Sequence, residues 1–221
     1  MNQVKHIIWD WNGTIVNDTW LFVELMNRIL NDRNLCLIDK EDYRNLFCFP
    51  LEKYYQSLGF DFKKEPYEVP SMEFVRLYDQ NKYKPELFNG IEDILSLVQS
   101  LGHYNYLLSA QNQDSLIDLV QFYSLGHYFS SIRGTDNFHA RGKNGLAKKI
   151  LKKISTSSNN IIFVGDTTMD VEMALQNNCK IIALTYGHHA TNRFKSNENI
   201  LLARSINELK TSLLALLSEN P

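Results

Sequence analysis

The sequence has few of the features that mark secreted, membrane-spanning or nucleic-acid-binding proteins. Its three cysteines are widely spaced and odd in number, so they form neither a disulfide framework nor a metal-ligand motif. Its apolar runs are far shorter than the ~20 residues of a membrane-spanning helix, and the run 7–9 is too short for a signal peptide. The formal net charge is −2, so no broad electrostatic field favours nucleic acid. We therefore expect a soluble, cytoplasmic protein, monomeric or homodimeric, whose partner is a small molecule.

The hydrophobic pattern that is present indicates an α/β protein. With 221 residues, 44% of them hydrophobic, the chain is long enough for one such domain carrying a smaller insert. Short, nearly continuous apolar runs rich in β-branched and aromatic residues are typical of parallel strands covered on both faces. These runs are 4–10, 104–110, 131–134, 161–166 and 181–186. Helical patterns lie between most of them, so the sequence predicts a doubly wound parallel sheet.

The segment after the first predicted strand interrupts this alternation. Its patterns at 47–58 and 72–83 are helical, and no convincing buried strand accompanies them. Pro66 and Pro70 bracket a predicted loop between these helices. We interpret the segment as a helical cap domain inserted into the α/β core. The predicted parts are a core of residues 1–16 and 86–221 and a cap of residues 17–85.

Acidic residues follow two of the predicted strands, where open parallel sheets bind their ligands. Asp10 ends the first strand, Gly13 permits a sharp turn after it, and Thr14 can bond to the loop or to a bound phosphate. Asp166 and Asp170 follow a later strand, and their spacing of four places both around the first turn of a helix. Carboxylates that converge from neighbouring strands form an oxygen-rich site suited to Mg²⁺.

Four segments in this order resemble the motifs of the haloacid dehalogenase (HAD) superfamily. They are Asp10–Thr14, Ser109, a basic residue near Lys143, and Gly165–Asp170. The resemblance covers nearly the whole chain, and the helical insert is similar to the small cap of the phosphoglycolate-phosphatase-like branch. It implies a HAD-like Rossmannoid core that hydrolyses a small phosphorylated metabolite with the help of Mg²⁺.

The resemblance also implies roles for the acidic residues. Asp10 would attack phosphorus and form an aspartyl-phosphate, which divides one difficult displacement into two easier ones. Mg²⁺ would be held by Asp10, the backbone carbonyl of Asn12 and Asp166, and it would screen the repulsion between the two anions. Asp170 would orient Asp166 or a bound water from outside this set of ligands.

The phosphate would be held by a hydroxyl and a lysine. Ser109 would donate a hydrogen bond to a phosphate oxygen, and Lys143 would neutralise charge on the phosphate and the nucleophile. Lys143 is favoured because 141–145 resembles a loop ahead of a helix, whereas Lys148 and Lys149 are predicted to lie on the solvated face of that helix. The other predicted contacts of the substrate are Gly13, Thr14 and Ala110.

Position 12 departs from the pattern of the superfamily. Its phosphatases usually carry a second Asp there, which serves as general acid and then as general base. Asn12 cannot donate a proton to a leaving group, and such help is worth ~10²–10⁴ in rate. Three interpretations are compatible with Asn12. In the first, the leaving group of the substrate needs no proton, as in an acyl phosphate or a phosphoanhydride. In the other two, another group supplies the proton, or catalysis is slow and the function is to bind a phosphate ligand. His188 and His189 are candidate proton sources, or ordinary surface histidines.

Two alternative functions remain open on the sequence. Phosphonoacetaldehyde hydrolases resemble the first motif, including Trp11, and they cleave a C–P bond after a cap lysine has formed a Schiff base. Lys53 is the candidate cap lysine here, or a solvated helix residue. A weakly active regulatory protein that binds a phosphate ligand is the second alternative. Substrate choice is expected to lie in the cap, where Phe47, Tyr54 and Tyr55 line the cleft or form the core of the cap.

Overall fold

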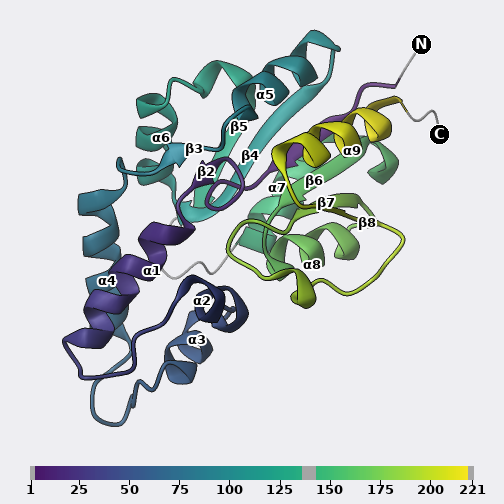
Figure 1. Ribbon diagram of the computed structural model, residues 1–221. Coiled ribbons are helices and arrows are strands. Elements are labelled where there is room, and N and C mark those ends of the chain that lie inside the picture. Colours follow the sequence, from purple (N-terminus) through teal and green to yellow (C-terminus); the bar gives the residue numbers. More distant parts are fainter. Residues whose placement is uncertain (1–2, 136–142, 219–221) are drawn as a thin grey trace.

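A six-stranded parallel sheet forms the centre of the computed structural model, which describes residues 3–135 and 143–218 (Figure 1). Its strands, in chain order, are β1 (His6–Trp9), β4 (Tyr104–Asn112), β5 (Phe129–Thr135), β6 (Ile161–Gly165), β7 (Lys180–Leu184) and β8 (Ile200–Ala203). They lie in the order β5-β4-β1-β6-β7-β8, and every neighbouring pair is parallel. The chain therefore winds outward in both directions from β1. This confirms the predicted doubly wound fold.

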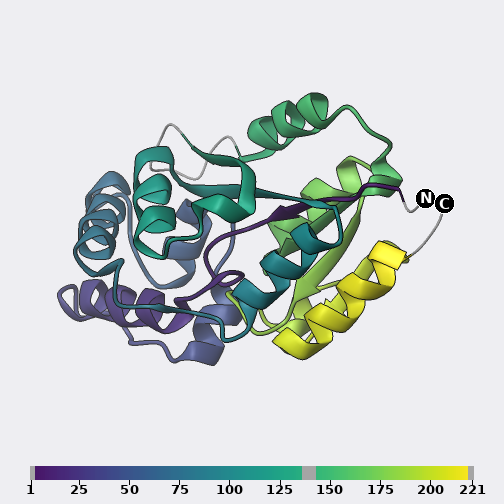
Figure 2. The ribbon, with the colours of Figure 1, turned by 90° about the horizontal axis from the view of Figure 1, so that it is seen from above.

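Helices cover both faces of this sheet, which explains why its strands are apolar without alternation. Ile7 and Trp9 pack into one hydrophobic cluster, and Ile8 between them packs into another. Helices α5 (Ile91–Ser100), α6 (Gln113–Phe122) and α9 (Ile206–Ser218) contribute to the first cluster. Helices α7 (Lys143–Ile154) and α8 (Thr168–Gln176) contribute to the second, and Figure 2 shows α7 and α9 on opposite sides. No helix among the described residues is both long and apolar enough to cross a membrane.

Four helices precede α5 and form a hydrophobic cluster of their own beyond the sheet (Figure 1). They are α1 (Thr19–Asn31), α2 (Lys40–Leu46), α3 (Leu51–Ser57) and α4 (Glu68–Asn81). A short antiparallel ribbon of β2 (Val16–Asn17) and β3 (Glu86–Leu87) joins both ends of this helical insert to the core. We propose on this packing that residues 17–85 form the cap domain and residues 1–16 and 86–221 the core.

Several elements differ from the sequence expectations for local reasons. Strand β8 was not predicted, because it is a four-residue edge strand paired only with β7. Helix α2 is mostly polar and buries only Tyr43, so it lacks an apolar stripe; Asp39 and Asp42 start it with a reciprocal capping box. Pro70 lies in the first turn of α4 and not in a loop, since the early N–H groups of a helix have no partner inside it. The remaining short elements are 3₁₀ turns at Gly126–Tyr128, Ser158–Asn160 and Thr191–Arg193.

Candidate active site at the carboxyl ends of the central strands

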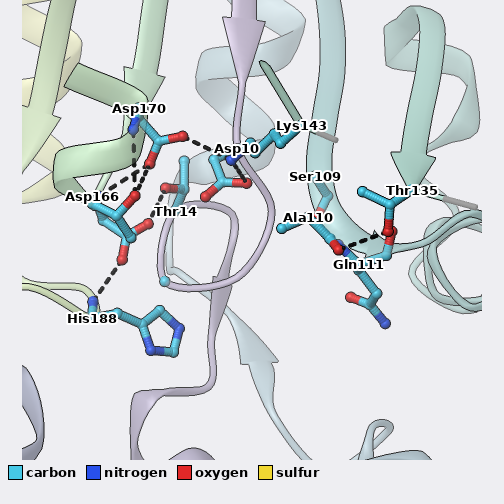
Figure 3. A network of polar contacts seen from close by, with 12 residues as sticks. Asp10, Thr14, Ser109, Ala110, Gln111, Thr135, Lys143, Asp166, Asp170 and His188 are labelled. Atoms are coloured by element: carbon cyan, nitrogen blue, oxygen red, sulfur yellow. Dashed lines mark hydrogen bonds and ion pairs between the residues drawn. The ribbon is translucent and has the colours of Figure 1, made fainter. Parts of the chain in front are cut away.

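Three carboxylates meet where β1 and β6 end. The backbone N–H of Asp10 donates to the carbonyl of Val164 (2.9 Å), which continues the β1–β6 pairing and places Asp10 beside the loop that follows β6. Asp166 lies in that loop and Asp170 in the first turn of α8. One oxygen from each of these three carboxylates lies within 4.8 Å of the others (Figure 3). The structure thus brings together the acidic residues that the sequence placed at the site.

The loop after β1 passes so close to Asp166 that it has no room for a side chain at Gly13. Gly13 has φ of +68°, and a Cβ atom there would lie 2.3 Å from Oδ2 of Asp166 and 2.4 Å from the ring of His188. Thr14 donates from Oγ1 to Oδ1 of Asp166 (2.8 Å). Thr14 therefore holds a carboxylate in place, a contact that the sequence did not specify.

Lys143 is the cation of the cluster. Its Nζ lies 2.7 Å from Oδ1 of Asp10 and 2.7 Å from Oδ1 of Asp170, and its side chain is only 3% exposed. Lys148 and Lys149 are exposed on the same helix. Lys143 begins α7, so it is not in a loop as expected, while residues 141 and 142 lie outside the described part of the chain.

Asp170 positions this lysine. Its Oδ2 accepts hydrogen bonds from the N–H (3.1 Å) and the hydroxyl (2.7 Å) of Thr167, which caps α8, and its Oδ1 binds Lys143. Gly165 leaves space for it, because a Cβ atom at that position would lie 2.4 Å from Cγ of Asp170. The sequence interpretation had Asp170 orient Asp166 or a water; in the structure its hydrogen bonds go to Thr167 and Lys143.

The electrostatics of the cluster fit a divalent cation. Burial raises the pKa of Asp10 to about 7, and the charges of Asp170 and Asp166 add to this against the opposing effect of Lys143. Burial also raises the pKa of Asp166 to about 6, opposed by His188. Burial disfavours the charge on Lys143, but Asp10 and Asp170 outweigh it and raise its pKa above the usual value. Among the described residues the cluster thus holds three carboxylates and one lysine, and hard oxygen ligands with excess negative charge suit Mg²⁺.

The two residues of β4 that are predicted to contact phosphate, Ser109 and Ala110, lie in the carboxyl-terminal half of this strand. Ser109 is buried, and its hydroxyl oxygen accepts a hydrogen bond from the N–H of Gln111 (3.1 Å). The carbonyl of Ala110 accepts one from the hydroxyl of Thr135 (3.0 Å), as Figure 3 shows. Ser109 and Ala110 line the same cavity as Asp10 and Lys143.

Asp18 is a buried residue of this site that sequence reasoning missed. The amide of Asn12 donates to Oδ2 of Asp18 (2.5 Å) and to the hydroxyl of Tyr78 (2.9 Å). Oδ1 of Asp18 accepts from the N–H of Gly13 (2.9 Å) and contacts Nε2 of His188 (3.1 Å). Before Thr19 an Asp resembles an ordinary helix cap, but its side chain makes no capping bond and turns to the loop instead.

His188 is not a surface histidine. It is 2% exposed, its Nε2 contacts Asp18, and its Nδ1 lies 2.7 Å from the hydroxyl of Tyr43. Its backbone N–H donates to Oδ2 of Asp166 (2.6 Å). Burial disfavours the charged ring, but the hydrogen bond and charge of Asp18 outweigh it and raise the pKa of His188. Both ring nitrogens of His188 contact residues of the insert, and its backbone N–H contacts Asp166. His188 therefore connects the insert to the loop after β6.

His189 is also buried and has a structural contact. Its Nδ1 accepts a hydrogen bond from the N–H of Thr168 (3.0 Å), which places the proton of the neutral ring on Nε2. Burial lowers the pKa of His189 to about 3, with Arg193 adding to the effect. Arg44 of α2 fixes the same segment by donating to the carbonyls of Gly187 (2.9 Å) and His189 (2.9 Å). The surface interpretation is therefore wrong for both histidines.

Lys53 does not reach the site. It is exposed on α3 and does not line the cavity that contains Asp10. Lys82 does line that cavity, but its ammonium group is paired with Asp79 (2.8 Å) and Asp118 (2.9 Å). Of the two interpretations of Lys53, the structure therefore fits the solvated helix residue and not the Schiff-base lysine.

Together the fold and the site define a hydrolase with a Rossmann-like core and an inserted helical segment. Residues 7–184 match the family model of the haloacid dehalogenase-like hydrolases, and the chain belongs to this family. The predicted resemblance to the HAD superfamily is confirmed.

Individual relatives are distant. "Probable phosphatase IndB" of Dickeya dadantii is 24% identical over 217 residues, which cover 96% of this chain and 94% of that protein. A phosphoglycolate phosphatase of Aliivibrio fischeri is 26% identical over 113 residues, which cover 51% and 50% of the two chains. A haloacid dehalogenase-like family hydrolase from Streptococcus pneumoniae superposes with a TM-score of 0.77 at 18% identity, covering 97% of this chain and 99% of that one.

The fold alone does not select an activity. Protein tyrosine kinase A of Mycobacterium tuberculosis superposes with a TM-score of 0.79 at 16% identity, covering 96% of this chain and 99% of that one. Function has to be argued from the residues at the site.

Proposed function

We propose that this protein is a Mg²⁺-dependent phosphohydrolase that acts on a small phosphorylated metabolite through an aspartyl-phosphate at Asp10. The observation that carries the proposal is the buried cluster of Lys143 with Asp10, Asp166 and Asp170, of which Asp10 and Lys143 line a cavity between the core and the insert. Phosphatases among the relatives support the same reaction class. The net charge of −2 supports a small-molecule partner over nucleic acid, and we propose a cytoplasmic location.

Asp10 is held for nucleophilic attack. Lys143 binds Oδ1 of Asp10, and the other carboxylate oxygen would form the bond to phosphorus as the bond to the leaving group breaks. The hydroxyl of Ser109 and the ammonium group of Lys143 would bind oxygens of the transferred phosphoryl group. Water would then attack phosphorus, releasing inorganic phosphate and regenerating the carboxylate. When bound by Asp10, Asp166 and the carbonyl of Asn12, Mg²⁺ would screen the repulsion between nucleophile and substrate.

The leaving group receives no proton from position 12. The amide of Asn12 is committed to Asp18 and Tyr78, and both ring nitrogens of His188 are engaged. A leaving group that departs as a stable anion needs no such proton. We therefore propose that acyl phosphates or phosphoanhydrides are better substrates than simple alkyl phosphates.

Phosphate release from acetyl phosphate and p-nitrophenyl phosphate tests this function. We expect release with Mg²⁺, loss of release with excess EDTA, and recovery when Mg²⁺ is restored. Release that is unaffected by EDTA would contradict the metal requirement. Saturable binding of a phosphate ligand without any release would favour a regulatory ligand-binding protein instead.

The stabilisation that Mg²⁺ provides should depend on pH. The folded-state pKa values of Asp10 and Asp166 are raised above those of the unfolded chain, so the folded state binds more protons and loses stability as the pH rises from about 4 to about 7. Mg²⁺ competes with these protons and relieves the repulsion among the ionised carboxylates. We expect added Mg²⁺ to raise the melting temperature more at pH 8 than at pH 5.5. An equal shift at both pH values would place the bound ion elsewhere.

A further inference from the structure

The cavity above Asp10 is large for a small acidic metabolite. It has a volume of 730 Å³ and is lined by residues of both the core and the helical insert. Cavities of ~300–1,000 Å³ are typical of sites that enclose drug-sized ligands. A phosphorylated two-carbon acid would leave most of this space empty, so the organic part of the substrate is expected to be larger.

The wall of the cavity opposite the carboxylates is aromatic. Among the described residues, nine Phe and Tyr side chains line it, all of them from the insert. Their rings hold one another in place: Tyr43 stacks on Phe47 (5.1 Å between centroids), Phe47 meets Tyr54 edge to face (5.3 Å), and Tyr54 meets Tyr55 in the same way (5.9 Å). Rigid aromatic walls favour flat apolar groups, which stack on ring faces or meet ring edges.

The positive charges of the cavity offer little to a second anion. Lys143 is paired with Asp10 and Asp170, and Lys82 with Asp79 and Asp118. Among the described lining residues, the remaining Lys or Arg is Arg76, which is exposed on α4. A carboxylate on the organic part of the substrate would therefore enter a largely apolar space whose buried cations are already paired, which is unfavourable.

The hydroxyl of Tyr54, a residue of this wall that is 2% exposed, is buried and has no hydrogen-bond partner among the described residues. Buried polar groups of native proteins are nearly always paired, so an orphaned one points to a missing partner. Burial raises the pKa of Tyr54 above its usual value, and the hydroxyl keeps its proton as a donor.

We infer that the organic part of the substrate is an uncharged aromatic or similarly flat apolar group that carries a hydrogen-bond acceptor for the hydroxyl of Tyr54. The inference rests on the proposed function, because it assumes that the phosphoryl group lies at Asp10. It excludes short phosphorylated acids as the preferred substrates. It therefore separates this protein from the phosphoglycolate phosphatases among its relatives.

The role of Tyr54 is tested with phosphonates, which bind without being cleaved. The probes are 2-phenylethylphosphonate and its three methoxy isomers, whose oxygen is an acceptor at different ring positions, measured by calorimetry with Mg²⁺. We expect one isomer to bind more tightly than the parent and Tyr54→Phe to remove that gain, about 5-fold or more for one hydrogen bond. Tyr186→Phe is the matched control, because its hydroxyl is also buried and unpartnered but does not line the cavity. A gain that survives Tyr54→Phe, or no gain for any isomer, would overturn this assignment.

The apolar preference is tested with ligands that differ only in the organic group. We expect 2-phenylethylphosphonate to bind roughly 10- to 100-fold more tightly than ethylphosphonate, as burial of one ring predicts. For turnover, kcat/KM should follow the order phenylacetyl phosphate, acetyl phosphate, succinyl phosphate, which share one type of leaving group. Equal binding of the two phosphonates, or a preference for succinyl phosphate, would overturn the inference while leaving a phosphatase. A strong preference in binding without turnover of any acyl phosphate would support the inference and contradict the proposed function.

Discussion

Asp10→Asn should reduce the rate of phosphate release by at least about 10⁴-fold, because an amide cannot form the bond to phosphorus and removal of a covalent nucleophile has effects of this size. The substitution keeps the shape of the side chain. It also removes one of three mutually repelling carboxylates. We therefore expect the variant to be at least as stable as the parent protein at pH 8 without Mg²⁺. Rates with acetyl phosphate and melting temperatures measure the two effects.

The matched control for this variant is Asp93→Asn. Asp93 is an exposed carboxylate in the first turn of α5, outside the cavity, and its replacement should leave the rate within about twofold, as surface substitutions usually do. An Asp10→Asn variant that is folded and retains more than about 1% of the parent rate would exclude a covalent intermediate at this residue. A loss of stability instead of activity would show that Asp10 has mainly a structural role.

Asn12→Asp alone should destabilise the protein at high pH. The amide of Asn12 lies 2.5 Å from Oδ2 of Asp18, so a carboxyl group at position 12 would face a buried carboxylate at hydrogen-bonding distance. Such a pair shares one proton, and the folded-state pKa of one member rises. The variant then loses stability as the pH rises from the pKa of this carboxyl group in the unfolded chain to its raised pKa in the folded protein. The difference in melting temperature between the parent protein and the variant should therefore be larger at pH 8 than at pH 5.5.

The exchange Asn12→Asp with Asp18→Asn should recover this stability and create a general acid. The amide at position 18 would donate to the new carboxylate, and its oxygen would still accept from the N–H of Gly13 and from His188. We expect kcat/KM for ethyl phosphate to rise by ~10- to 1,000-fold, within the usual range of general acid–base catalysis. The value of kcat/KM for acetyl phosphate should change little, because it reports the first phosphoryl transfer and this leaving group needs no proton, which makes it the internal control.

The exchange of residues 12 and 18 also tests the proposal that Asn12 limits the protein to substrates whose leaving group needs no proton. Equal gains with ethyl phosphate and acetyl phosphate would mean that the new carboxyl group does not act by protonating the leaving group. No gain in a variant with the parent melting temperature would mean that Asn12 is not what limits the hydrolysis of alkyl phosphates. Either result would contradict the leaving-group argument made from Asn12.

The sequence was sufficient for most of the sheet, because each of the five predicted strands carries its own signal. The run 161–166, for example, is apolar on both faces up to the acidic residue with which it ends, and that residue marks the end of the strand. Strand β8 and helix α2 have weak signals of this kind, because β8 is a short edge strand and α2 buries only Tyr43. Their places are set by the elements against which they pack.

The residues of the candidate site also fall into two groups, those that the local sequence pattern identified and those that only the structure revealed. Asp10, Asp166 and Asp170 were identified because each lies beside a strand or helix end that is visible in the local pattern. Lys143 was favoured over two neighbouring lysines, and the structure shows it buried between carboxylates 133 and 27 residues away in the chain. Their catalytic roles remain predictions for the experiments above.

What the sequence by itself determined is the order of most strands and helices and the acidic residues at the strand ends, because hydrophobic periodicity and turn residues act over a few neighbouring positions. Only the tertiary structure decided that Asn12 would be bound by Asp18 and Tyr78, that His188 would be buried, and that an aromatic cavity would cover Asp10. These contacts join residues up to 170 positions apart. A single sequence does not indicate which of these distant side chains will meet, because it is the packing of the insert on the core that brings them together.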